Sequence, residues 1–77
     1  MPKNRFSTRS TKRFKKYEKS RGKWYFSTDF TLPDFIAANR HDPATTDIVV
    51  ELKKLPVGAS YVYDGGAGGV DKFTRVA

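Results

Sequence analysis

FTLPDF, at residues 30–35, is the stretch that decides the predicted fold, because it contains the clearest helix start in the chain. Thr31 is a favourable N-cap residue, and Asp34 stands three residues later, where an acidic side chain can cap the helix reciprocally. The two phenylalanines flank this cap at the spacing of a hydrophobic staple. We therefore predict a helix over residues 32–40.

The next segment supports two interpretations. Asp42 followed by Pro43 is typical of a second helix start. Helical spacing over residues 43–55 leaves one apolar residue, Val50, off the buried side, whereas strand alternation leaves Val49 off it. Three β-branched residues in a row favour a strand, while the length and the cap favour a helix. We predict a helix over residues 43–55 and keep a strand as the alternative.

The C-terminal part has the pattern of a β-hairpin. Residues 60–63 and 70–76 are rich in strand-forming side chains and flank a glycine-rich tip. Pairing Asp64 with Val70 would set Tyr61 opposite Phe73. One side of the hairpin would then carry Tyr61, Tyr63, Phe73 and Arg75.

Charge is concentrated at the N-terminus. Residues 1–23 have a net charge of +9 and residues 24–77 a net charge of −2, within a total of +7. Such asymmetry predicts a basic, mobile arm over residues 1–23 joined to a folded body over residues 24–77. A short helix over residues 10–19 is conceivable within the arm. The aromatic stretch over residues 24–30 favours a strand or an extended lead-in to the first predicted helix.

The order of capped helix, turn, second helix and glycine-tipped hairpin resembles winged helix-turn-helix domains over residues 30–76. The resemblance implies an α+β fold, a small winged-helix-like domain of two helices plus a C-terminal β-hairpin with a basic N-terminal arm. It also implies that the second helix enters the major groove of DNA while the hairpin touches the backbone. The residues that it places at DNA are Thr45, Thr46, Lys53, Lys54, Lys72 and Arg75.

The basic arm predicts an anionic partner, because its charge exceeds what solubility requires. We expect a small nucleic-acid-binding protein, a DNA-binding or transcription-regulatory factor, with DNA favoured over RNA. Phosphate contacts are expected from Arg5, Arg9, Lys12, Arg13, Lys15, Lys16, Lys19, Arg21 and Lys23. Stacking on bases, or anchoring of an interface, is expected from Phe14, Tyr17, Trp24 and Tyr25.

Two other functions fit the same features. A protein-binding adaptor or inhibitor, of the kind phages encode, would dock on a larger enzyme or nucleoprotein complex through its exposed aromatic residues. A ribosomal or RNA-packaging protein would use the arm on structured RNA.

Several classes of function are not expected. The chain has 77 residues, one histidine and no cysteine, so it offers neither a disulfide framework nor a Cys/His metal site. His41 has no evident catalytic partners, and we expect neither an enzyme nor a cofactor. No apolar run is long enough to span a membrane, and we expect a cytoplasmic protein without a membrane partner.

Overall fold

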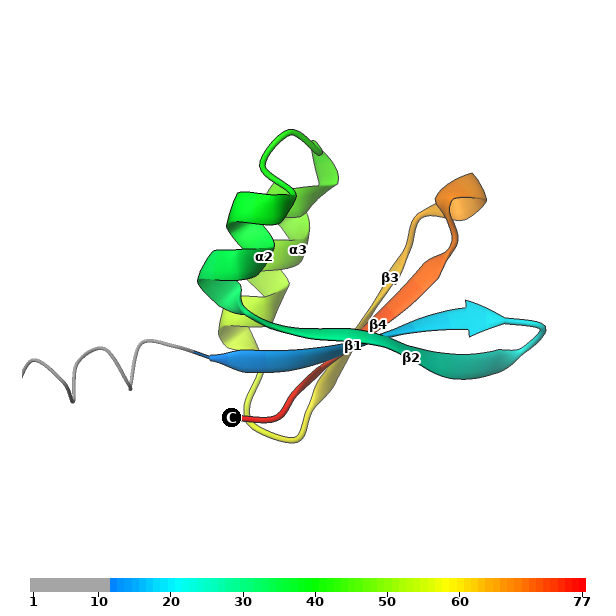
Figure 1. Ribbon diagram of the computed structural model, residues 1–77, viewed down its shortest axis with the longest axis horizontal. Coiled ribbons are helices and arrows are strands. Elements are labelled where there is room, and N and C mark those ends of the chain that lie inside the picture. The colour runs from blue at the N-terminus through cyan, green and yellow to red at the C-terminus, as the bar shows by residue number, and fades with distance from the viewer. Residues whose placement is uncertain (1–11) are drawn as a thin grey trace, which may run out of the picture.

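The computed structural model describes residues 12–77, where two helices cover one side of a four-stranded antiparallel sheet (Figure 1). In chain order the elements are β1 (Arg13–Ser20), β2 (Lys23–Thr31), α2 (Leu32–Ala38), α3 (Ala44–Lys54), β3 (Ser60–Asp64), the short 3-10 turn η1 (Gly66–Gly68) and β4 (Val70–Arg75). The strands lie in the order β2-β1-β4-β3. β1 and β4 are therefore the central strands, and β2 and β3 are the edges.

The winged-helix expectation is wrong. Two strands precede the helices, and β1 pairs with both β2 and β4. The C-terminal hairpin therefore completes a sheet that begins near the N-terminus, instead of standing beside the helices as a wing. The fold is an α+β domain built as hairpin, helix pair and hairpin.

β1 replaces the short helix that we considered over residues 10–19. Its side chains alternate, and Phe14 is fully buried while Arg13 and Lys15 are exposed. A tight turn at Arg21 and Gly22 joins β1 to β2, and both residues have positive φ, as a two-residue hairpin turn of type I′ requires. The boundary expected at residue 23 thus falls within a hairpin, and residues 13–20 belong to the folded domain. Pairing with strands on both sides decides this structure, and local sequence does not report such pairing.

Both predicted helices are confirmed. The Asp34 amide donates to the Thr31 hydroxyl at 3.3 Å, which caps α2. The Phe30 and Phe35 rings stack with centroids 4.9 Å apart, as the staple predicted. At the second helix start, the Ala44 amide donates to the Asp42 carboxylate at 3.0 Å. The strand alternative for residues 43–55 is excluded, because α3 occupies residues 44–54.

The C-terminal hairpin has the predicted register. Asp64 pairs with Val70 and Tyr61 pairs with Phe73. The side of the sheet that carries Phe73 packs against the helices. The core consists of Phe14, Leu32, Phe35, Ile48, Leu52 and Phe73. All of its sheet residues lie on this one side, and among residues 12–77 no helix covers the opposite side of the sheet (Figure 1).

Candidate nucleic-acid interface

The uncovered side of the sheet carries basic and aromatic side chains together. Phe14 points into the core, so its neighbours Arg13 and Lys15 point to the other side, followed by Tyr17 and Lys19. Strand pairing places further side chains beside them from β2 and β4. We call this surface the open face, and its members are Arg13, Lys15, Tyr17, Lys19, Trp24, Phe26 and Lys72.

A β-bulge brings the β2 aromatic residues onto the open face. Lys16 pairs with Thr28 and Tyr17 pairs with Phe26, so Ser27 is an extra residue in β2. Phe30, which pairs with Phe14, faces the core. If Ser27 instead took a regular place in the ladder opposite Tyr17, strict alternation from Phe30 would turn Phe26 to the core side as well. The bulge reverses the alternation and delivers Trp24 and Phe26 to the other surface.

Two aromatic rings of the open face contact each other, and the Lys72 ammonium lies between one of them and the third. Tyr17 and Phe26 meet edge to face with centroids 5.9 Å apart. Phe26 is 57% exposed, which is unusual for a phenylalanine and leaves part of its ring accessible to a partner. Trp24 pairs with Lys19 two positions further along the hairpin.

Ammonium groups lie over these rings. The Lys72 Nζ is 5.1 Å from the centre of the Tyr17 ring and 5.0 Å from that of Trp24. The Lys19 Nζ is 5.6 Å from the Trp24 ring, and the Lys15 Nζ is 6.0 Å from the Phe26 ring. Cation–π attraction therefore holds positive charge directly beside the surfaces on which a flat ligand would stack.

The other side of the sheet has a different electrostatic character. Lys16 lies there with its Nζ 3.5 Å from Glu18 and 4.0 Å from Asp71, so two carboxylates neutralise it. Burial raises the pKa of the Asp71 carboxyl; the Lys16 ammonium lowers it, and the Glu18 charge adds to the rise. A hollow of about 310 Å³ between the helices and the β3–β4 hairpin is lined by Asp42 and Asp71 among others. Carboxylates in these positions would repel the phosphates of a nucleic acid.

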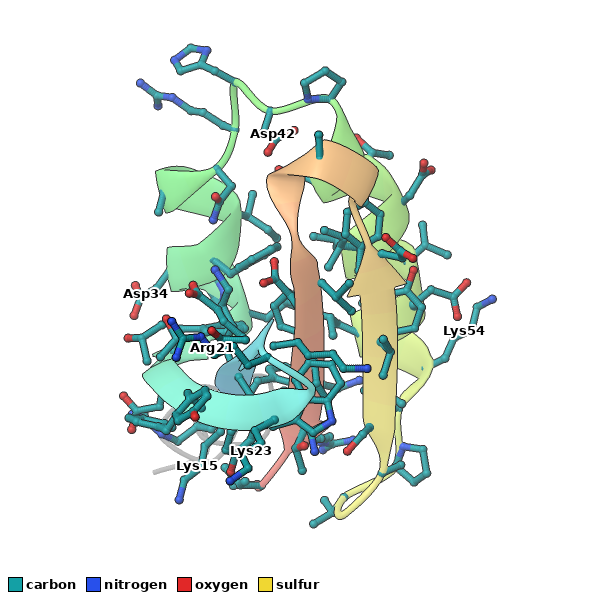
Figure 2. The ribbon with its side chains drawn as sticks, turned by 90° about the vertical axis from the view of Figure 1, so that its right-hand side faces the viewer. Lys15, Arg21, Lys23, Asp34, Asp42 and Lys54 are labelled. Atoms are coloured by element: carbon teal, nitrogen blue, oxygen red, sulfur yellow. The ribbon has the colours of Figure 1, made fainter. Side chains whose placement is uncertain are left out.

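In Figure 2, Lys15 points away from the helices, whereas Asp34 lies on α2 and Asp42 lies in the connection between α2 and α3. Strand alternation puts two acids on the open side, Asp29 opposite Lys15 and Asp64 at the end of β3, both on edge strands. The centre of the open face is therefore cationic.

The expected stacking residues divide into three groups. Tyr17 and Trp24 lie on the open face. Phe14 is fully buried in the core and has no free face for a base. Tyr25 is 52% exposed but pairs with Glu18, on the side opposite to Phe26. Phe26, which lies on the open face, was not among the expected stacking residues, and the bulge that turns it there has no sequence signature.

The expected phosphate contacts are also dispersed. Arg13, Lys15, Lys19 and Lys72 lie on the open face, whereas Arg5 and Arg9 fall outside the described residues. Arg21 and Lys23 lie at or beside the exposed tip of the β1–β2 hairpin.

Three other residues that were expected to contact nucleic acid instead form hydrogen bonds to backbone carbonyls within the fold. The Lys12 Nζ donates to the Lys53 carbonyl at 2.8 Å, and the Arg75 guanidinium donates to the Leu55 carbonyl at 2.9 Å, so both side chains tie the sheet to the end of α3. Thr45 is buried, and its hydroxyl donates to the Asn39 carbonyl at 2.6 Å.

The remaining residues of the expected reading helix are Thr46, Lys53 and Lys54, which are exposed on α3. The Lys54 Nζ lies 3.7 Å from Glu51. Without a winged-helix arrangement, the reason for placing these side chains at DNA is lost.

Comparison with known proteins gives no match: no family model fits the chain, and neither a curated protein nor a solved structure is significantly similar to it. Among residues 12–77, no three His, Asp or Glu side chains gather in a group able to hold a metal ion. The helices in this part of the chain are too short or too polar to cross a membrane.

Proposed function

We propose that the protein binds single-stranded nucleic acid on the open face. The observation that carries the proposal is the alternation of aromatic rings and ammonium groups over β1, β2 and β4, in which Phe26 is exposed, Tyr17 and Trp24 are partly exposed, and the Lys72 ammonium lies against both Tyr17 and Trp24. Proteins that bind single strands combine a cationic surface for the phosphates with aromatic side chains on which successive bases stack. Both components are present here on one surface.

A single strand fits this surface better than a duplex does. The bases of a duplex are already stacked and paired, so they cannot stack on Tyr17, Trp24 or Phe26 without being extruded. Stacking accepts every base, and this part of the open face supplies few hydrogen-bonding groups for reading base edges. We therefore expect weak sequence preference and strong dependence on salt.

Two adjacent residues offer a matched test. Phe26 and Tyr25 are 57% and 52% exposed and lie on opposite sides of β2. We expect Phe26→Ala to weaken binding of a fluorescein-labelled oligothymidylate about 5- to 150-fold in an anisotropy titration, as loss of one stacked base predicts. Tyr25→Ala should stay within about twofold of the unaltered protein.

The same titration with an RNA of equal length will show whether the sugar matters. Circular dichroism melting checks that both variants fold. If Tyr25→Ala weakens binding as much as Phe26→Ala, or if neither matters, the open face is not the binding surface.

A further inference from the structure

Lys72 differs from the other cations of the open face, because its ammonium group lies against two rings at once. It pairs with Tyr17 across β1 and β4, and its side chain reaches over β1 toward Trp24 on β2. The Nζ is 5.1 Å from the Tyr17 ring and 5.0 Å from the Trp24 ring. Lys15 lies over the Phe26 ring at the longer distance of 6.0 Å.

This position makes the Lys72 ammonium a competitor for the surface that a base would use. A ring that stacks on Trp24 or Tyr17 must displace the ammonium, which then loses two cation–π contacts. A neutral aromatic ligand supplies no replacement for that lost attraction. A nucleotide strand does, because the phosphate next to the stacked base can accept the displaced ammonium.

We propose that Lys72 makes the open face selective for phosphate-bearing strands over neutral aromatic ligands. The inference rests on the proposed function and specifies its ligand class: a base together with its adjoining phosphate, and not a base alone. In the free protein Lys72 covers the two rings. In the complex a base replaces it there, and its ammonium binds the phosphate.

The test compares two oligothymidylates of the same length and base content, one with phosphodiester and one with uncharged methylphosphonate linkages. Removing the ammonium by Lys72→Ala should weaken binding of the phosphodiester strand, because a phosphate contact is lost. It should strengthen binding of the methylphosphonate strand about 5- to 30-fold, because a base that stacks on Tyr17 or Trp24 no longer has to displace the Lys72 ammonium. Lys72→Gln, which keeps most of the side chain and removes its charge, should act like Lys72→Ala: it should weaken phosphodiester binding and strengthen methylphosphonate binding. This result would show that the effect comes from the charge.

Lys15→Ala is the matched control, since it also removes one cation from the open face. It should weaken phosphodiester binding and leave methylphosphonate binding within about twofold, because the Lys15 ammonium lies over the Phe26 ring only at 6.0 Å, the outer limit of a cation–π contact, and over neither Tyr17 nor Trp24. If Lys72→Ala weakens both strands, or leaves methylphosphonate binding unchanged, the selectivity proposal is wrong. If the unaltered protein fails to bind the phosphodiester strand at all, the proposed function fails first, and the two failures are distinguishable.

Discussion

Neutralising two cations on the open face should reduce the salt dependence of binding, whereas neutralising two on α3 should not. The open-face variant is Lys15→Gln with Lys19→Gln, and the control is Lys53→Gln with Lys54→Gln. All four side chains are exposed. Each pair lowers the net charge of +7 by two, so the total charge of the two variants is equal and only the position of the loss differs.

The size of the effect follows from counterion release. Each phosphate that a protein cation neutralises on a single strand contributes about 0.7 to the slope of log K against log salt concentration. Lys15 and Lys19 lie beside Phe26 and Trp24, where a stacked strand would place its phosphates. Losing both lysines should therefore make the negative slope shallower by about 1.4.

Fluorescence anisotropy with a labelled oligothymidylate at four or five potassium chloride concentrations measures both slopes. Figure 2 shows Lys54 on α3, apart from Lys15. The control slope should match that of the unaltered protein. Equal reductions in the two variants would refute the reasoning, because they would show that total charge matters and its placement does not.

Three further predictions concern the architecture. Deleting Ser27 should remove the bulge and keep the pairs of Tyr17 with Phe26 and of Lys19 with Trp24, so that the variant still binds the single strand while circular dichroism reports a folded sheet. Phe14→Ala should cost about 3–5 kcal/mol in the free energy of unfolding, measured by urea denaturation, because the ring is fully buried. Asp71→Asn should stabilise the protein at pH 7, since burial raises the pKa of this carboxyl above its ordinary value of 3.8 and folding therefore favours the protonated form. The unaltered protein loses stability as the pH rises through the Asp71 pKa, so the gain from the substitution should shrink below about pH 4 in melts across pH.

Local signals predicted the elements whose contacts are close in sequence. The Thr31 cap and the staple of Phe30 and Phe35 depend on residues within one helical turn, and both are present. The Tyr61 and Phe73 pairing depends on a short connection, which fixes the register once Asp64 and Val70 are aligned.

The part that sequence analysis missed depends on pairing between distant segments. β1 lies between β2 and β4, and its partnership with Val70–Arg75 spans more than fifty residues of chain. Lys15 and Lys19 looked like part of a mobile arm, because the positive charge around them masked a strand that contributes one buried residue, Phe14, to the core. The bulge at Ser27 was equally hidden, since it depends on how β2 meets β1.

The sequence predicted which kinds of residues form the candidate site, but not where they lie on the fold. Basic and aromatic residues between 13 and 24 were expected to bind nucleic acid together, and several of them do share one surface. Their arrangement on a rigid sheet was not expected. Phe26 and the double contact of Lys72 with Tyr17 and Trp24 emerged only from the strand register.

The emission of Trp24 tests the central claim most directly, because it is the only tryptophan in the chain and it lies on the open face. A base that stacks on the indole should quench its fluorescence. As oligothymidylate is added at low salt, quenching should saturate at the same concentration as the anisotropy change and reverse when salt is raised. Binding that leaves the emission of Trp24 unchanged would contradict the account, because the strand would then bind elsewhere on the protein.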